Sequence, residues 1–307
     1  MNKDEALKII KKDSLELKNL PDIFKKDKEI VLKALEQYGC VLKYVDESLK
    51  KDKDIVLSAV QQNGYALEFA DGTLKKDKEI VLSAVQQNGY ALEFADETLK
   101  KDKEVVLETV KQNGYALEFA DDSFKKDKNI VMTAVKNYCF SLMHADRYLK
   151  QDREIVLEAI KQYGYSLKYA SEDLKKDKEV VFEALKKNVF SMLYVDESLK
   201  KNKEFILKVL PQCKIGTFME YVDNSLKQDR EVVLLAVKYW GTALQFVDES
   251  FRKDKEIILE AIKQYGESLQ YADNSLKKDK KFILEVVKNS ISACAFIDDS
   301  LKKDPDI

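Results

Sequence analysis

The residue types that most often perform catalysis are few in this chain and do not cluster. His144 is the only histidine, and no serine or cysteine stands at a spacing that would make it a nucleophile beside that ring. The cysteines are far apart and form no CxxC pair, unlike a metal-binding set or a disulfide framework. They are Cys40, Cys139, Cys213 and Cys294. No phosphate-binding loop, dinucleotide fingerprint or zinc-protease motif occurs. We therefore predict no catalytic residue, no metal and no cofactor, and we expect a protein that is not an enzyme.

Lysine pairs recur along the chain and offer a different chemistry, the binding of an anionic partner. Lys75 and Lys76 directly precede Asp77, and this arrangement returns in nearly every part of the sequence. Stacked pairs would form ladders suited to nucleic acid or another polyanion. However, opposite charges interleaved at this spacing usually give a solvated and largely neutral edge. The net charge of −2 also lacks the basic excess typical of nucleic-acid binding. Polyanion binding is therefore an alternative, not our first interpretation.

A row of aromatic residues, one every 25 positions, is the third candidate. Its members are Tyr65, Tyr90, Tyr115, Phe140, Tyr165 and Phe190. The row then ends, because the equivalent residues are Thr217, Thr242, Glu267 and Ser292. Tyrosine is favoured at protein interfaces, so the row predicts a partner-binding stripe. Packing at a turn would explain the same pattern, and both interpretations remain open.

The element that must position these side chains is a repeat of about 25 residues, marked by an acidic residue after two mostly basic ones. The marks are Asp27, Asp52, Asp77, Asp102, Asp127, Asp152, Asp177, Asn202, Asp229, Asp254, Asp279 and Asp304, with Asp4 opening an atypical first unit. Two neighbouring stretches, 55–71 and 80–96, have the same sequence, IVLSAVQQNGYALEFAD. Such duplication multiplies surface and does not build a unique catalytic pocket.

Each repeat predicts a long helix, a tight turn, a short helix and a capped linker. With Asp77 as position one, Asp77 can cap a helix of about eleven residues. Gly89, at position thirteen, is expected to close that helix in the left-handed conformation. The stretch 90–101 predicts a shorter helix, partly of 3₁₀ type, and Asp96 is expected to cap the turn that follows.

One such hairpin cannot bury its own apolar face, so neighbouring repeats must stack. The fold class we predict is all-α: an α-solenoid, a right-handed superhelix of about twelve helix–turn–short-helix repeats, forming a single domain over residues 1–307. An aromatic ring at position eighteen should form a spine between the layers. His144 occupies that position, which makes it a tolerated core substitution.

The array is irregular at residues 189–217. Val189 replaces the turn glycine, Asn202 replaces the capping aspartate, Pro211 interrupts a helix, and two extra residues precede Gly216. A β-branched valine should resist a left-handed turn, so we expect different geometry there. Drift in the array, a bend and a partner site are all compatible with these changes.

The last repeat presents apolar residues with no further repeat to cover them. They are Ile291, Cys294, Phe296 and Ile297. We expect a monomer, and an end-to-end dimer through this surface stays open.

The aligned unit, D-K-E-[IV]-V-L-x-A-V-x-x-x-G-x-[AS]-L-x-[FY]-A-D, resembles the bacterial, protist and viral repeat family labelled domain of unknown function 4116. The resemblance extends over nearly the whole chain from Asp27 onward. It implies an α-helical repeat protein without an established activity, so it transfers no functional residue.

Our leading hypothesis is a non-catalytic scaffold that binds a protein or peptide on its concave or aromatic-lined surface. A nucleic-acid or polyanion binder is the first alternative, and an effector or inhibitor that occludes a target enzyme is the second. No signal peptide or membrane-spanning stretch is recognised, so we expect a cytoplasmic protein that does not contact a membrane, with export by a non-classical route left open.

Overall fold

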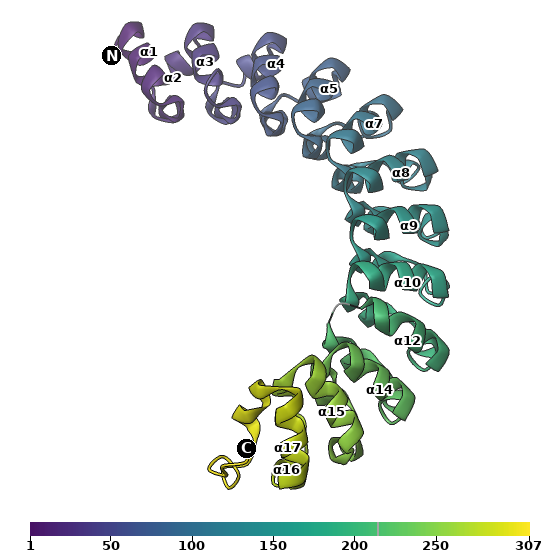
Figure 1. The fold of residues 1–307 in the computed structure, drawn as a ribbon. Helices are drawn as coiled ribbons and strands as arrows, with labels where there is room; N and C mark the ends of the chain where they lie inside the picture. Colours follow the sequence, from purple (N-terminus) through teal and green to yellow (C-terminus); the bar gives the residue numbers. More distant parts are fainter. Residues whose placement is uncertain (214) are drawn as a thin grey trace. The chain divides into compact units, whose positions relative to one another are not determined.

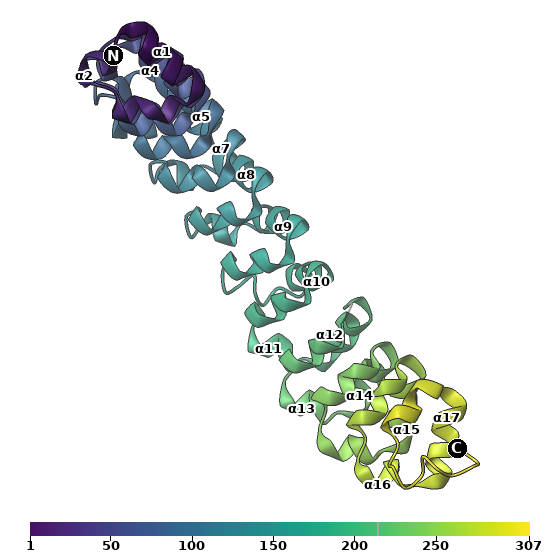
Figure 2. The same ribbon diagram turned by 90° about the vertical axis from the view of Figure 1, so that its left-hand side faces the viewer.

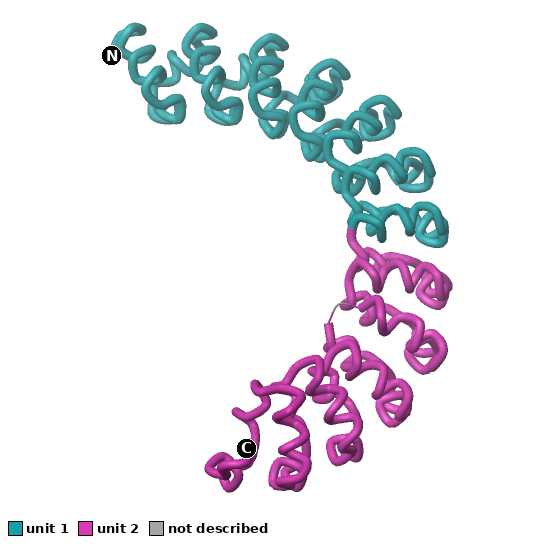
Figure 3. Tube along the Cα trace, viewed as in Figure 1, with its two compact units in different colours: residues 1–162 teal, residues 163–307 magenta. Residues whose placement is uncertain are grey.

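The computed structural model describes residues 1–213 and 215–307; Lys214, in the irregular repeat, lies outside the described residues. The described part of the chain is all-helical, with no β-strand, and it consists of repeated helical units. Two compact units divide it: unit 1, Met1–Gln162, and unit 2, Tyr163–Ile307 (Figure 3). The all-α repeat architecture expected from the sequence is confirmed, and each unit is described by itself.

Each repeat opens with an α-helix, and the repeats of each unit follow one another in chain order (Figure 1). In unit 1 these helices are α1 (Lys3–Lys12), α3 (Lys28–Leu35), α4 (Lys53–Gln62), α5 (Lys78–Gln87), α7 (Lys103–Gln112), α8 (Lys128–Asn137) and α9 (Arg153–Gln162). In unit 2 they are α10 (Lys178–Lys187), α12 (Lys203–Val209), α14 (Arg230–Tyr239), α15 (Lys255–Gln264) and α17 (Lys280–Asn289).

The second helix of each repeat is a 3₁₀ helix of six residues. In unit 1 these are Ser14–Asn19, Gly39–Tyr44, Gly64–Phe69, Gly89–Phe94, Gly114–Phe119 and Cys139–His144. In unit 2 they are Gly164–Tyr169, Val189–Tyr194, Gly216–Tyr221, Gly241–Phe246, Gly266–Tyr271 and Ile291–Phe296. The short helix predicted over 90–101 is therefore confirmed in part: its first half is a 3₁₀ helix, Gly89–Phe94, and a separate α-helical turn, α6 (Glu97–Lys100), follows.

The linkers carry a last short helical turn in most repeats. Some of these turns are α-helical: α2 (Asp22–Lys25), α6 (Glu97–Lys100), α11 (Glu197–Lys200), α13 (Asn224–Lys227) and α16 (Asn274–Lys277). Others are 3₁₀ turns: Leu49–Lys51, Leu74–Lys76, Phe124–Lys126, Leu149–Gln151 and Glu249–Lys253, with Leu210–Gln212 in the irregular repeat.

The capping aspartate begins most long helices as predicted, but not α1, where Asp4 lies inside the helix and Asn2 is the cap, accepting from the Glu5 N–H. The Asp77 carboxylate accepts hydrogen bonds from the backbone N–H groups of Glu79 (3.0 Å) and Ile80 (3.4 Å). These N–H groups have no partner inside the helix, so the side chain fixes the first turn. Asn202, which replaces the aspartate, still caps α12 by accepting from the Phe205 N–H at 2.9 Å. The irregular repeat therefore keeps the capping hydrogen bond at the start of its helix, although the capping side chain is no longer charged.

The glycine prediction is wrong in its mechanism, because none of the glycines, all of which lie in the described ranges, has a positive φ. The turn is made instead by the residue before the glycine, as at Asn88, which is extended (φ −154°, ψ 112°). What glycine provides is close approach: a Cβ on Gly39 would lie within 3.0 Å of the carbonyl oxygen of Ala59 in the next repeat. The helix of one repeat therefore packs against bare backbone of the repeat before it.

Val189 was expected to force a different turn, and this expectation is also wrong. Val189 is buried and begins a 3₁₀ helix of six residues like the others, since the turn needs no left-handed residue. The backbone instead differs in the next repeat, where the long helix α12 has 7 residues, not the 10 of α5, and ends at Val209. Pro211 then lies in a 3₁₀ turn, Leu210–Gln212.

The core between repeats is aliphatic. Ile80, Val81, Ala84 and Leu92 are fully buried, and their equivalents are buried in most of the other repeats. Consecutive long helices pack side by side, as α4, α5, α7 and α8 do in unit 1 and α14, α15 and α17 do in unit 2 (Figure 2). The rings at position eighteen are only half-buried, as Phe94 is. They do not form the spine that we predicted, because they lie at the border of a core that is mostly aliphatic and takes in a few other rings, Phe205, Phe218 and Phe282.

Hydrogen bonds also join consecutive repeats. The Asp96 N–H donates to the carbonyl of Lys75 at 3.0 Å, and the same bond recurs along both units. The Gln62 side chain accepts from the Gly39 N–H (2.8 Å) and donates to the carbonyl of Gln37 (3.1 Å), the end of the preceding helix. These bonds give partners to backbone groups at the turn, among them the N–H of the buried Gly39.

In the last repeat, Ile291 is 81% exposed while Ile297 is buried. Cys294 and Phe296 are half-buried. The apolar surface expected at this end is therefore reduced mainly to Ile291.

Candidate functional site

The predicted aromatic row lies at the start of each 3₁₀ helix, and each of its rings lies against the position-eighteen ring of the following repeat where both belong to one unit. In unit 1 the ring centroids are 6.1 Å apart for Tyr65 and Phe94, 6.2 Å for Tyr90 and Phe119, and 4.6 Å for Tyr115 and His144. In unit 2 they are 4.9 Å apart for Tyr165 and Tyr194 and 6.4 Å for Phe190 and Tyr221. Edge-on pairs of this kind are favourable for aromatic rings.

The rings are packed and partly accessible at once. Tyr65 is 38% exposed and Phe190 44%, while Tyr90 and Tyr115 are half-buried. Packing at the turn and presentation to a partner are therefore both properties of this row.

Sequence reasoning missed a second set of rings at position twelve, the turn residue directly before the glycine position. In unit 1 these are Tyr38 and Tyr138, both 42% exposed. Tyr138 contacts Tyr115 (6.0 Å between centroids) and Phe140 (5.4 Å). Tyrosine recurs at position twelve in the sequence, but not in every repeat. Asparagine takes this position in other repeats and caps the 3₁₀ helix, as Asn88 does by accepting from the Tyr90 N–H.

We use the name aromatic edge for the rings at positions twelve, fourteen and eighteen of unit 1. Its members are Tyr38, Tyr44, Tyr65, Phe69, Tyr90, Phe94, Tyr115, Phe119, Tyr138, Phe140 and His144. At its first repeats the edge is hollowed into an open groove of about 730 Å³. Rings from two repeats line this groove together with Asp13, Lys43 and Glu68.

Cys40 stands in the groove where later repeats have a ring. Burial raises the pKa of this half-buried thiol, although a hydrogen bond with Tyr38 acts in the opposite direction. A thiol with a raised pKa is a poor nucleophile at neutral pH, because the thiolate is the reactive form. Cys40 therefore serves as a small apolar lining residue.

His144 lies at the far end of the aromatic edge, with its ring against Tyr115. Burial lowers the pKa of the imidazole, the nearby Lys125 and Lys150 lower it further, and Glu118 raises it. Among the described residues, none forms a hydrogen bond with its buried Nε2 atom. The environment is that of a neutral ring in a packed aromatic cluster.

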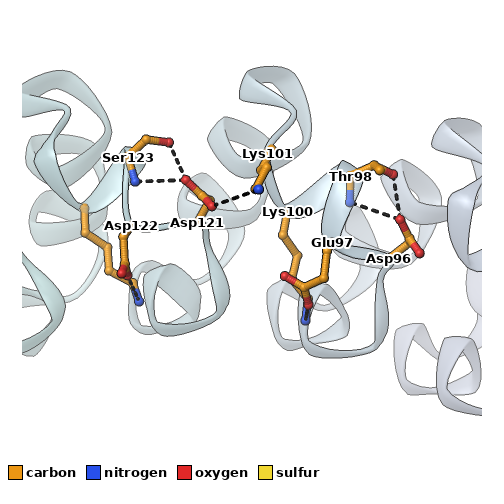
Figure 4. Close-up of polar contacts among 9 residues, drawn as sticks. Asp96, Glu97, Thr98, Lys100, Lys101, Asp121, Asp122 and Ser123 are labelled. Atoms are coloured by element: carbon orange, nitrogen blue, oxygen red, sulfur yellow. Dashed lines mark hydrogen bonds and ion pairs between the residues drawn. The ribbon is translucent and has the colours of Figure 1, made fainter.

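The lysine pairs are engaged by neighbouring groups. Lys75 donates to the carbonyl of Glu68 (2.8 Å), and the Lys76 ammonium lies 3.8 Å from the Asp96 carboxylate. In the next repeat Lys100 pairs with Glu97 at 2.8 Å and Lys101 with Asp121 at 3.8 Å (Figure 4).

A further ladder of cations joins successive repeats at position two. Lys53 forms ion pairs of 2.7 Å with both Asp77 and Glu79 of the next repeat, and these hydrogen bonds raise its pKa to about 12. Lys78 bridges to Asp102 and Glu104 in the same way. The sequence shows the charges but not this pairing, since the partners are 24 and 26 residues apart.

The recurring Asp and Ser/Thr of the linker are structural. Asp96 accepts from the Thr98 N–H (3.0 Å) and hydroxyl (2.7 Å), and Asp121 accepts from both groups of Ser123 (Figure 4). These hydrogen bonds hold the pKa of both carboxylates below the usual range.

Residues 1–213 and 215–307 contain no group of three or more His, Cys, Asp and Glu side chains placed to hold a metal ion. Burial raises the pKa of Cys213 to about 12. No helix in these ranges is long and apolar enough to cross a lipid bilayer.

Comparison with known families gives one result. A family model described as "Domain of unknown function (DUF4116)" matches the chain in overlapping stretches: 2–50, 29–75, 52–100, 102–150, 152–200, 177–227, 202–252 and 229–277. No curated protein matches the chain.

Proposed function

The chain belongs to the DUF4116 repeat family, whose description assigns no activity, and we propose that it is a non-catalytic repeat scaffold that binds a protein or peptide through the aromatic edge. The observation that carries the proposal is the contact of rings across successive repeats, with Tyr38, Tyr65 and Tyr138 each about two-fifths exposed. Tyrosine offers a large contact area and a polar hydroxyl at small entropic cost, which suits a binding surface.

The proposal includes the α-solenoid architecture, a right-handed superhelix of twelve repeats in a single array. Its support is the repetition of the same contacts between neighbours within each unit and the family match at residues 152–200, which spans the end of unit 1. Repeat arrays present extended surfaces to their partners, so a site composed of equivalent positions is expected in such a protein.

The ion pairs favour this function over polyanion binding. A lysine that already pairs with carboxylates of the next repeat, as Lys53 does, releases less free energy when it meets a phosphate. An inhibitor that occludes an enzyme would use the same aromatic edge and would be recognised by inhibition of the captured partner.

Capture of a partner from native lysate tests the proposal. The variant changes the exposed rings Tyr38, Tyr65 and Tyr138 to alanine, and it should recover at least about tenfold less of the partner, as for loss of interface hot spots. Since these rings are exposed, the helical content should stay unchanged in circular dichroism.

The matched control changes Ile23 and Tyr148 to alanine, because both are exposed (73% and 62%) and lie in linkers of unit 1. This control should capture the partner as the unchanged protein does. Equal recovery of the same partner by the ring variant and by the unchanged protein would refute the proposal.

A further inference from the structure

Three carboxylates beside the aromatic edge are not neutralised. Glu68, Glu93 and Glu118 occupy position seventeen of consecutive repeats and are exposed. None of the ion pairs between described residues involves them, in contrast to the carboxylates at positions one and three. The Lys75 ammonium donates to the backbone carbonyl of Glu68, at 2.8 Å.

In the preceding repeat, a lysine occupies position seventeen and shows that a cation can lie against the position-eighteen ring of the next repeat. Lys43 occupies position seventeen there, and its ammonium lies over the Phe69 ring of the next repeat, 5.8 Å from the centroid. Cations are attracted to aromatic faces at this distance. The following repeats keep the ring, as Phe94 and Phe119, but carry Glu68 and Glu93 in place of the lysine. Before Phe94 and Phe119, a carboxylate therefore holds the position from which Lys43 reaches the Phe69 ring.

The C-terminal ends of the long helices add to the negative charge of these carboxylates. α4, α5 and α7 end immediately before the 3₁₀ helices that carry these rings and carboxylates. The C-terminal end of an α-helix carries a partial negative charge, which favours cations. Asp13 adds a carboxylate to the groove at the start of the edge. The one lysine lining that groove is Lys43, already placed over Phe69.

The spacing of the rings suits an extended chain. The centroids of Tyr90 and Tyr115, equivalent residues of neighbouring repeats, are 6.4 Å apart. Alternate side chains of an extended peptide are about 6.6–6.8 Å apart. At this pair of repeats, an extended peptide can therefore offer one side chain to each ring.

We propose that the aromatic edge of unit 1 binds an extended basic peptide segment. Its lysine or arginine side chains lie against the rings of Phe94 and Phe119 and pair with Glu68, Glu93 and Glu118. This inference rests on the proposed function and specifies its partner by charge: the partner is basic, opposite to the acidic partner that the lysine pairs suggest.

Fluorescence anisotropy with a labelled peptide of about twelve residues, alternating lysine and serine, tests the inference. The unchanged protein should bind this peptide, more weakly as salt is added, and should not bind the same peptide with glutamate in place of lysine. The variant E68Q/E93Q/E118Q should raise the Kd at least about tenfold, since three exposed pairs and their ring contacts are weakened together.

The matched control is E47Q/E97Q/D122N, which removes the same charge from three linker carboxylates of unit 1 that pair with lysines three residues away. Its Kd should change by less than about twofold. A second variant, F94L/F119L, keeps an apolar side chain but removes the ring faces, and it should also weaken binding.

An unchanged Kd in E68Q/E93Q/E118Q, or tighter binding of the acidic peptide, overturns the inference. Failure of the proposed function gives a different result. If the ring variant captures the lysate partner normally, the scaffold proposal fails; if it loses a partner that E68Q/E93Q/E118Q still captures, only the basic-peptide inference fails.

Discussion

At the scale of single residues, Gly39 and Gly72 show what glycine does in this repeat. A Cβ on Gly39 would come within 3.0 Å of the backbone of the next repeat, whereas a Cβ on Gly72 would meet no atom within 4 Å. We predict that G39A lowers the free energy of unfolding by about 1–3 kcal/mol, because the next helix must move away. Urea denaturation followed by circular dichroism measures this loss.

G72A is the matched control in the same unit, and it should be neutral or slightly stabilising, since alanine restricts the unfolded chain. Equal losses for both variants would contradict the close-approach explanation and would favour a backbone requirement at both positions.

His144 predicts a pH dependence at the same scale. Burial lowers its pKa from the ordinary 6.5, so the unfolded state binds the proton more readily than the folded state. Stability should therefore decrease as the pH falls below about 6.5. The capping carboxylates have lowered pKa values and lose their contribution only as the pH falls below 3.8.

The variant H144F restores the ring found in other repeats and removes this titration. Its melting temperature should fall less than that of the unchanged protein between pH 7 and pH 5. Parallel curves for the two proteins over this interval would show that His144 does not titrate with folding.

At the scale of the helix, one aspartate both begins α5 and joins it to the preceding repeat. Asp77 caps the helix and pairs with Lys53, and that pair lowers the pKa of its carboxyl. We predict that D77A costs about 1–2 kcal/mol of unfolding free energy. D77N should cost less, because asparagine caps as well, as Asn202 does for α12.

Urea denaturation at pH 7 compares these variants with D54A, whose carboxylate is exposed and caps no helix. D54A should stay within about 0.5 kcal/mol of the unchanged protein. A D77N variant as unstable as D77A would mean that the ion pair, and not the cap, carries the effect.

The sequence predicted what local chemistry determines and failed where neighbouring repeats decide. The caps at Asp77 and Asp96 depend on residues two and three positions away, so the sequence of one repeat is enough to predict them. The role of Gly39 depends on a carbonyl twenty residues on, and a sequence shows the small residue without the atom it faces. The same holds for the candidate site, since the aromatic row was visible but its pairing with position-eighteen rings arises only from stacking.

At the scale of the whole molecule, the ladder of position-two cations contributes less to stability than its length suggests. The ammonium of Lys78 is substantially exposed, although it lies 2.7 Å from Asp102 and 2.8 Å from Glu104. Exposed pairs are worth about 0.2–1 kcal/mol each and are screened by salt. The ladder therefore sets the register between neighbouring repeats, and the aliphatic core supplies most of the stabilisation.

The single-array proposal predicts the dimensions of the molecule in solution. A compact globule of this length would have a radius of gyration of about 19 Å. Twelve repeats spaced by about 8–10 Å along one array give a clearly larger value, because every repeat contacts only its neighbours. Small-angle X-ray scattering measures the radius, and sedimentation equilibrium checks that the particle has the 35.4 kDa of a monomer. A monomer with a radius near 19 Å would contradict the solenoid, while a particle of twice that mass would replace the expected monomer with a dimer.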